Sequence, residues 1–543
     1  MKKIITLLLA AHCATAHAKP PEKPNIILIY ADDISARELP VYGSSVWTDP
    51  SGHDTSDPKY RAETPVLDKL AEKGCWITNA WAATVCSPSR AMMMTGRYAH
   101  LHKWWHNGDL GMTMTKSGKL NTWPLYESSP LLIGHVAQNA GYNTYWAGKT
   151  QMKNSDLTKF GFDEGVFSPG EEGNKESPYS DFQIIAKKID GKQVMIDRST
   201  GKEGGLYPGS SYFWKPFVSL MNFPGEKSAM TWWPNTPETR KDFGVNTYAP
   251  DVELDYIFEF MERKKSTGKP FFIYHTSHLG HGYYDWFNPD FKSWPGTPKV
   301  KWDGKKYIRT EPTITKTADG YDTSSITEQG IHHHINYLDY QVWLYQNKLE
   351  EMGIAENTVL IFCADNGTSG YGKSSKDRQK GCHVPFIIYA PGMTKHGKQD
   401  VLLNLTDLLP TIADLGGYSL PKGYEINGES MVPFLYTDKP DLRDWVYAYN
   451  GASQLIRGKK VLKDGNEKWW DVDNIPEDLI SFDEIKDWNS VSETHRSERD
   501  KLEKILPDFD LHEKEHDDPN LPEAAKKPSD KKKKKQPKPK KHN

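Results

Sequence analysis

The sequence predicts an α/β fold in which a large, mostly parallel β-sheet is sandwiched by helices. A smaller C-terminal α+β subdomain with an antiparallel sheet follows it. Short apolar runs with the length of buried strands alternate with helical patterns along most of the chain, and such alternation is typical of a parallel sheet covered on both faces. After Leu435 the pattern changes to short apolar runs separated by turns, which predicts the antiparallel subdomain.

Five apolar runs are predicted to be strands of the large sheet. They are rich in Ile, Val, Phe and Tyr, which strands favour. In chain order they are Asn25–Ala31, Thr144–Ala147, Pro270–Tyr274, Thr358–Cys363 and Pro385–Tyr389. Three further runs have the spacing of antiparallel strands in the C-terminal subdomain, namely Trp445–Tyr449, Ser453–Leu462 and Trp469–Val472.

Two helices are clear in the sequence. Thr64 is suited to cap a helix that has Pro65 at its first position and ends at Gly74. A longer helical pattern begins at Ile335 and ends at Gly353. The triplet His332–His334 stands at the start of this pattern, where we expect an ordinary structural role.

The first residues predict a secretory signal peptide over residues 1–18. Two lysines precede the apolar run Ile4–Ala11, and Ala16–Ala18 has the small-x-small pattern of a cleavage site. The apolar run is too short to cross a bilayer, which takes about 20 residues. We therefore expect a secreted, periplasmic or cell-surface protein.

Composition excludes several classes of protein. A mean hydropathy of -0.70 excludes an integral membrane protein with many spans. Without Cys13 of the predicted signal peptide, four cysteines are left, too few for a scaffold built from disulfides. One pair could form a bridge in an oxidising compartment, but the sequence does not select which.

The charge of the chain is unevenly distributed. Residues 526–543 contain ten lysines and one aspartate, although the whole chain has a formal net charge of -3. The rest is therefore acidic, which argues against nucleic acid as a partner. Residues 521–543 are predicted to form a disordered Lys-rich tail. Either this tail is simply solvated, or it binds electrostatically to an anionic polymer or membrane surface.

Acidic and amide side chains follow two of the predicted strands. Asp32 and Asp33 come directly after one strand, and Asp365 and Asn366 follow another. Ligands of open α/β sheets bind beyond the carboxyl ends of the strands. Oxygen donors of this kind suit Ca²⁺ or Mg²⁺, whereas zinc prefers His and Cys. The sequence therefore predicts a site for a hard divalent cation at one edge of the sheet.

The segment from Cys86 to Arg97 reads CSPSRAMMMTGR. A lone cysteine is usually a small buried apolar residue, but the Ser, Pro and Arg that follow this one predict an exposed turn entering a helix. Cys-x-Pro-Ser-Arg with Thr-Gly-Arg downstream resembles the signature of the type I sulfatases of the alkaline phosphatase superfamily. The resemblance implies an alkaline phosphatase-like fold. It also implies a formylglycine, made from Cys86 by a maturation enzyme, whose hydrated form attacks sulfur.

The resemblance spans nearly the whole chain outside the tail. It implies residues 19–436 as the sulfatase catalytic domain and 437–520 as the C-terminal subdomain. It implies one divalent cation, usually Ca²⁺, bound by Asp32, Asp33, the formylglycine at Cys86, Asp365 and Asn366. It further implies Cys86, Arg90, Lys149 and His281 as catalytic residues, and Lys149, His281, Lys373, His278 and Gln151 at the substrate.

One position departs from the family pattern. The family usually has Lys-x-His where this chain has Lys149-Thr150-Gln151, and that histidine is thought to help expel sulfate. A glutamine cannot act as a base near neutral pH. Either another group takes the role, with His278 the nearest candidate by motif, or turnover is slow. Gly381-Cys382-His383 also departs from the usual Gly-Gly-x-Arg, which we interpret as tuning of the substrate pocket.

Parts of the sequence also fit three other classes of protein. Gly367–Ser374 matches the P-loop pattern, but the polar residues after it do not predict the helix that a nucleotide site needs. A phosphomonoester or phosphonate hydrolase of the same superfamily and a catalytically silent sulfoglycan-binding protein stay as alternatives. Export and the long insertion between Gly165 and Pro250 favour a sulfated polysaccharide or oligosaccharide as substrate.

Overall fold

The computed structural model describes residues 21–510 and residue 512, with several gaps between them. The gaps are 115–119, 153–154, 169–183, 198–212, 214–217, 233–247, 283–295, 313–314, 318–319, 323 and 511. The predicted signal peptide and Lys-rich tail lie outside the described residues, as does much of the insertion after Gly165.

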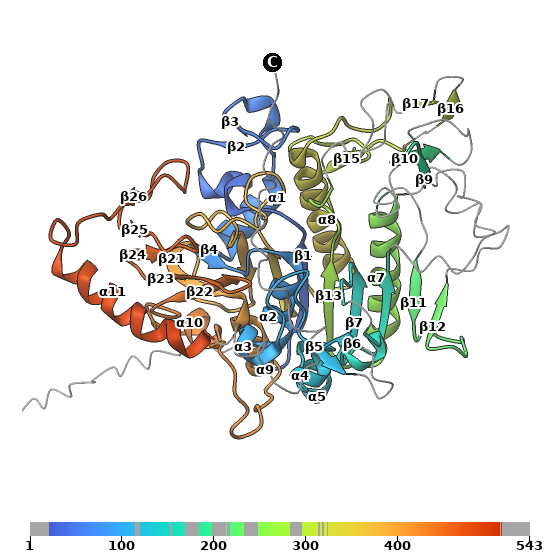
Figure 1. Ribbon diagram of the computed structural model, residues 1–543. Coiled ribbons are helices and arrows are strands. Elements are labelled where there is room, and N and C mark those ends of the chain that lie inside the picture. Colours follow the sequence, from blue (N-terminus) through green and yellow to red (C-terminus); the bar gives the residue numbers. More distant parts are fainter. Residues whose placement is uncertain are drawn as a thin grey trace, which may run out of the picture.

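An eleven-stranded sheet forms the centre of the molecule (Figure 1). Its order is β12-β11-β8-β7-β13-β1-β18-β20-β4-β19, with β21 paired to β4. The central run from β8 to β18 is parallel, and the strands on either side of it pair antiparallel, except that β21 is parallel to β4. The predicted α/β fold is confirmed, with the parallel part at its centre.

All five predicted strands of the large sheet are present. They are β1 (Asn25–Ala31), β7 (Asn143–Gly148), β13 (Phe271–Thr276), β18 (Thr358–Ala364) and β20 (Phe386–Tyr389). The other members are β4 (Cys75–Trp81), β8 (Glu164–Phe167), β11 (Ser219–Met221), β12 (Met230–Trp232), β19 (His383–Val384) and β21 (Gly397–Asn404). Every residue of β1, β13 and β18 is buried, which explains why they read as continuous apolar runs.

The pairing register brings three strand ends together. Tyr30 of β1 lies opposite Thr276 of β13, and Ala31 lies opposite Ala364 of β18. Because the three strands are parallel, the residues that follow them emerge at the same edge of the sheet.

Helices cover the sheet in two groups. In one, α1 (Pro65–Lys73) packs on α8 (Ile331–Glu351), and α7 (Ala249–Lys265) packs on β7 and β13. In the other, α2 (Cys86–Thr95), α5 (Ile133–Asn139) and α9 (Leu408–Leu415) pack on one another. Short helices are α3 (Ala99–His102), α4 (Leu125–Ser128) and α10 (Val432–Tyr436).

The predicted helices are found with two differences. Thr64 is the N-cap residue of α1, but its hydroxyl bonds to Asp68 instead of capping the backbone. The α1 N–H groups of Val66 and Leu67 donate to the carboxylate of Asp339 in α8. In addition, α8 begins at Ile331, so His332–His334 lie inside its first turn.

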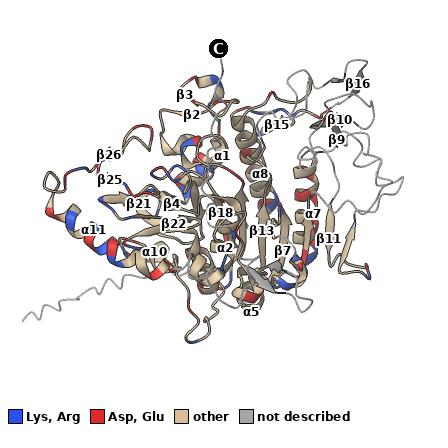
Figure 2. Cartoon of the chain, viewed as in Figure 1, with Lys and Arg blue, Asp and Glu red and all other residues tan. Residues whose placement is uncertain are grey.

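A five-stranded antiparallel sheet forms the C-terminal region. It contains β22 (Val446–Asn450), β23 (Ser453–Arg457), β24 (Val461–Lys463), β25 (Trp469–Asp471) and β26 (Asp483–Glu484). The predicted strand Ser453–Leu462 is two strands, β23 and β24, joined by residues 458–460. An unpredicted helix, α11 (Glu493–Ile505), follows the sheet, and Figure 2 shows both signs of charge along it. The boundaries of the subdomain at 437 and 520 stay a prediction.

The C-terminal sheet shares its core with the main domain. Ala83, Met92 and Tyr98 pack in one buried cluster with Tyr447 and Ile456. A second buried cluster joins Trp81 of β4 to residues of β22 and β23. Two buried apolar clusters therefore join the C-terminal sheet to the rest of the chain.

Small two-stranded hairpins complete the described structure. They pair β2 (Trp47–Thr48) with β3 (Asp54–Thr55), β5 (Met112–Met114) with β6 (Leu120–Thr122), β9 (Ile184–Ile189) with β10 (Lys192–Asp197), β14 (Val300–Trp302) with β15 (Tyr307–Arg309), and β16 (Thr315–Thr317) with β17 (Gly320–Asp322). Within the part of the chain described, no helix has the length and apolar character needed to cross a membrane.

Candidate active site

Three carboxylates and one thiol meet at the carboxyl ends of the central strands. The side chains of Asp32, Asp33, Cys86 and Asp365 are buried, and one ligand atom of each lies within 4.8 Å of the others. Asp33 has a positive φ of 55°, and its backbone N–H donates to Asp365 Oδ1 at 2.9 Å. Two strand ends predicted to share an edge therefore do so.

Asn366 belongs to the same cluster. Its Nδ2 donates to Asp33 Oδ1 at 2.8 Å, while its buried Oδ1 has no hydrogen-bond partner among the described residues. A buried amide oxygen without a donor is costly. Together with three carboxylates, this oxygen makes an oxygen-rich set that fits a hard divalent cation such as Ca²⁺.

Three cations neutralise the carboxylates. Arg90, one turn into α2, donates to Asp365 Oδ2 at 2.8 Å and lies 3.4 Å from Asp32 Oδ1. The ammonium of Lys149 donates to Asp32 Oδ2, and that of Lys373 donates to Asp33 Oδ2 at 2.7 Å.

The pKa values show how strongly these charges interact. Burial alone would raise the pKa of Asp32, but Lys149, His281 and Arg90 hold it well below its ordinary value. The pKa of Asp33 is also lowered, chiefly by Lys373 acting against burial. Asp365 behaves differently, because burial and the neighbouring Asp32 raise its pKa to about 7.

Cys86 is the first residue of α2 and is completely buried. Its Sγ lies 3.5 Å from Asp33 Oδ1. The expectation of an exposed turn is therefore wrong, because α2 begins at Cys86 and all its residues are buried. The helix packs on α5 and α9, and its Met92 lies in one buried cluster with residues of the C-terminal sheet. Burial raises the pKa of the thiol, with Lys149 opposing this and the carboxylates adding to it. An unmodified Cys86 would therefore be a neutral, poorly nucleophilic thiol.

Two histidines follow β13 at the same edge. His281 Nε2 lies 3.9 Å from Asp33 Oδ2, and burial and Lys149 lower its pKa to about 4. His278 is almost completely buried, and its Nε2 donates to the carbonyl of Ser168 at 2.6 Å. Burial, followed by Lys149, lowers the pKa of His278 to about 3. His281 thus faces the acid cluster, whereas His278 is engaged with the backbone after β8.

Lys149 and Gln151 follow β7. The Lys149 N–H donates to the carbonyl of Thr276 at 2.7 Å, which ties the end of β7 to that of β13. Gln151 has a positive φ of 50°, and its buried Oε1 has no partner among the described residues. The structure thus brings Lys149 into the acid cluster. Among the described residues, no hydrogen bond or ion pair links Gln151 to the cluster.

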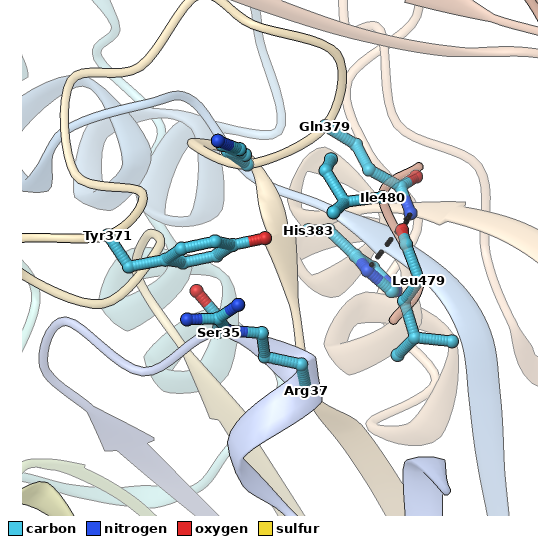
Figure 3. Close-up of a pocket in the computed structure, with 8 residues that line it drawn as sticks. Ser35, Arg37, Tyr371, Gln379, His383, Leu479 and Ile480 are labelled. Carbon is cyan, nitrogen blue, oxygen red and sulfur yellow. Dashed lines mark hydrogen bonds between the residues drawn. The ribbon is translucent and has the colours of Figure 1, made fainter. Parts of the chain in front are cut away.

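The segment carrying Lys373 is fixed to the segment after Asp33. Thr368 and Ser35 exchange two hydrogen bonds, at 2.8 and 3.0 Å, and the Lys373 N–H donates to the Thr368 carbonyl at 3.0 Å. Arg37 lies with its guanidinium 3.1 Å from the centroid of the Tyr371 ring, beside a cavity about the size of one water molecule (Figure 3). Only turns and irregular chain lie between the P-loop-like sequence and β19, so the nucleotide interpretation has no helix to support it.

Sequence reasoning missed one neighbour of the acid cluster. Ser369 donates its hydroxyl to Asp33 Oδ2 at 2.7 Å. Ser369 lies three residues after Asn366. A polar residue so close to the end of β18 could have been predicted to join the site. The four cysteines left after the predicted signal peptide are all free thiols.

Comparison with known proteins gives a consistent result. The family model described as Sulfatase matches residues 24–418, more than half of the chain. Arylsulfatase A of Homo sapiens is 26% identical over 482 residues, which cover 85% of this chain and 77% of that protein. An ulvan-active sulfatase of Formosa agariphila is 23% identical over 458 residues, covering 82% of this chain and 66% of the relative.

A solved structure shares the fold. The crystal structure of Ps i-CgsB in complex with k-i-k-neocarrahexaose superposes with a TM-score of 0.56 and 20% sequence identity. The match covers 89% of this chain and 93% of the other.

Proposed function

The chain belongs to the sulfatase family and is a sulfuric ester hydrolase, and we propose that it removes sulfate from a polysaccharide or its oligosaccharides. We further propose that it does so with a divalent cation and a formylglycine made from Cys86 by a maturation enzyme. The observation that carries this proposal is the buried cluster of Asp32, Asp33 and Asp365 around Cys86.

The substrate class is supported by the named activities of similar proteins. One relative is an ulvan-active sulfatase, and Ps i-CgsB was crystallised with an oligosaccharide. The proposed export of this chain would place it where such polymers occur. The Lys-rich tail would then contact an anionic surface, either the polymer or a membrane.

Calcium is the cation that best fits the ligand set. Asp32, Asp33, Asp365 and Asn366 would hold it together with the modified Cys86. When bound, the cation would withdraw electron density from the sulfate oxygens, and the hydrated formylglycine would supply the nucleophilic oxygen. The orphaned Oδ1 of Asn366 supports this assignment, because a cation would satisfy it.

The protein's own cations would bind the sulfate group. Lys149, from the segment after β7, donates to Asp32, and Lys373, from the segment after β18, donates to Asp33. Their charges would stabilise the negative charge that grows on the reacting oxygens. Arg90 bonds the cluster from the next turn of α2, which fixes residue 86 relative to Asp365.

His281 would protonate the leaving oxygen. Burial and Lys149 keep its pKa at about 4, so the ring is neutral near pH 7 before substrate binds. A sulfate monoester brings a negative charge beside it, which raises the pKa of a neighbouring histidine. Substrate binding would therefore favour the protonated form of His281, which is the form that can donate a proton.

Release of sulfate is the step that we expect to limit turnover. Gln151 occupies the position of the family histidine and cannot accept a proton near neutral pH. His278 is the nearest alternative by motif, but its Nε2 is engaged with Ser168 and its pKa is lowered to about 3. Both features make it a weak base.

The decisive experiment is mass spectrometry of the peptide containing Cys86, purified from the native host. A formylglycine is the expected result, and an unmodified thiol would favour a silent binding protein. Activity on a panel of sulfated glycans should be lost in Cys86→Ala and in metal-stripped protein. Calcium should restore the activity of the metal-stripped protein. Phosphate monoesters and phosphonates in the same panel test the alternative hydrolase, and a preference for them would overturn the sulfatase substrate.

A further inference from the structure

The turn that carries both histidines is pressed against the backbone of the acid cluster. The Asp32 N–H donates to the carbonyl of Leu279 at 3.2 Å, and the His281 N–H donates to the carbonyl of His278 at 3.1 Å. Gly280 has a φ of +105°, and a Cβ placed on it would lie 1.9 Å from the carbonyl oxygen of Asp32. The position of His281 is therefore set by this tight turn.

A third histidine holds the turn from the other side. The Gly280 N–H donates to Nδ1 of His334 at 3.0 Å, across 54 residues of sequence. His334 is completely buried in the first turn of α8, with Phe213 against its ring at 5.2 Å between centroids. A nitrogen that accepts a hydrogen bond must be unprotonated, so this contact also fixes the tautomer of His334.

Helix α8 holds β13 at a second point. Tyr345 of α8 bonds to His275 Nδ1 at 3.0 Å, five residues before Gly280. His334 and Tyr345 are 11 residues apart, about three helical turns or 16 Å along one face of the helix. Helix α8 therefore bonds both to His275, near the end of β13, and to Gly280, in the turn that follows the strand.

The helix itself is firmly anchored. Asp339 of α8 accepts hydrogen bonds from the backbone of Val66 at 3.1 Å and Leu67 at 2.6 Å, and also from the hydroxyl of Tyr307. His334 is therefore a rigid support, since the element that carries it is fixed to α1.

We propose that His334 is a positioning residue for leaving-group protonation, because it holds Gly280 and thereby aims His281 at the leaving oxygen. This inference rests on the proposed function, in which His281 is the proton donor. Of the histidine triplet His332–His334 at the start of α8, only His334 has a role in this proposal.

The test compares His334→Leu with His334→Asn in the purified, matured enzyme. Leucine fills the space without an acceptor, whereas the Asn oxygen can occupy the place of Nδ1. The readout is kcat/KM for a series of aryl sulfates whose phenols range from strongly to weakly acidic. Protonation matters most for weakly acidic leaving groups.

We expect His334→Leu to lose about tenfold or more on the weakly acidic phenols and little on the strongly acidic ones. His334→Asn should recover most of the loss. The matched control is His332→Leu, on the same turn of α8. In this control the dependence of kcat/KM on the acidity of the phenol should be the same as in wild type. The His281→Ala variant should show the same selective loss, and adding His334→Leu to it should cost little more.

A uniform loss across the series, or no loss, would overturn the inference even where wild type is an active sulfatase. If wild type cleaves no sulfate ester, the proposed function itself has failed. If His334→Leu does not fold, His334→Gln replaces it, because its oxygen falls near the place of Nε2. A series parallel to wild type in that variant would also overturn the inference.

Discussion

At the scale of single residues, the active site is a balance of opposed buried charges. Three carboxylates at the strand ends face three cations, Arg90, Lys149 and Lys373, from three separate segments. Buried charges are tolerated only when they are paired. Removing one partner leaves an uncompensated buried charge. Each of these residues therefore stabilises its neighbours in addition to binding a ligand.

Replacing Lys373 should therefore affect both binding and the state of the site. Lys373→Ala leaves Asp33 without its closest cation, so the pKa of Asp33 should rise and substrate sulfate should bind more weakly. We expect kcat/KM to fall by about 100-fold or more. Steady-state kinetics check this. The control is Lys376→Ala, on the same segment, because the ammonium of Lys376 donates to Ser453 and not to a carboxylate of the cluster. Equal activity in the two variants would show that Lys373 does not contact sulfate.

Restoring the family residue at position 151 should speed turnover. Gln151→His introduces a base beside Lys149, and histidine is among the residues that tolerate the positive φ found there. We expect the steady-state rate to rise by about tenfold or more. Rapid-mixing experiments should show that the first release of the alcohol is unchanged. Gln151→Ala serves as control, and an equal rate in all three proteins would mean that sulfate release is not limiting.

At the scale of elements, turns and helices decide where these side chains point. The turn at Gly280 is the clearest case, because it has no room for a Cβ. Gly304, in the turn between β14 and β15, has a similar φ of +101° but open space around the position of a Cβ. Comparing Gly280 with Gly304 therefore distinguishes the cost of backbone strain, which both positions share, from steric conflict, which only Gly280 has.

We expect Gly280→Ala to be the more damaging of the two alanine variants. Gly304→Ala should cost only the backbone strain, about 1–3 kcal/mol. Gly280→Ala adds a collision with Asp32 and should lower the melting temperature further and remove most activity. Calorimetry and kinetics on both variants measure this. Equal melting temperatures would show that the turn can move away from Asp32.

The contact between α8 and α1 should make stability depend on pH. Burial raises the pKa of Asp339 to about 7, against an ordinary value near 4. A carboxyl whose pKa is raised by folding stabilises the fold when protonated. Its contribution is complete below about pH 4 and is lost as the pH rises through about 7. The loss is at most a few kcal/mol, since one pKa unit is about 1.4 kcal/mol.

Asp339→Asn removes this titration, so its free energy of unfolding should fall less between pH 4 and pH 8 than that of wild type. Urea unfolding at several pH values, with calcium present throughout, measures the difference. Parallel pH profiles would contradict the assignment to Asp339.

At the scale of the whole molecule, two buried clusters join the C-terminal sheet to the catalytic part of the chain. Tyr447 of β22 is buried against Tyr98, which follows α2. Asn404, at the end of β21, donates to the carbonyls of Trp81 and Tyr447, at 2.8 and 3.0 Å. The C-terminal sheet also contacts the helix on which Cys86 lies, through Met92 and through the hydroxyl of Tyr449, which donates to the carbonyl of Pro88.

The protein should accordingly unfold in a single calorimetric transition. A chain truncated after residue 436 would expose the apolar residues of both shared clusters, so we expect it not to fold. Tyr447→Ala should cost about 3–5 kcal/mol without splitting the transition. Two separate transitions in wild type would show that the C-terminal region folds independently.

The sequence by itself determined the fold class, five strands of the large sheet, two helices, the two strand-end acid pairs and the Cys86 signature. These are local patterns, since burial on both faces makes a strand continuously apolar and chemistry at a strand end needs polar residues directly after it. Only the tertiary structure decided that Cys86 is buried, that Ser369 bonds Asp33 and that His334 supports the turn of His281. Each depends on segments far apart in the chain. Strand pairing and helix packing bring these segments together, and local sequence patterns do not predict such long-range contacts.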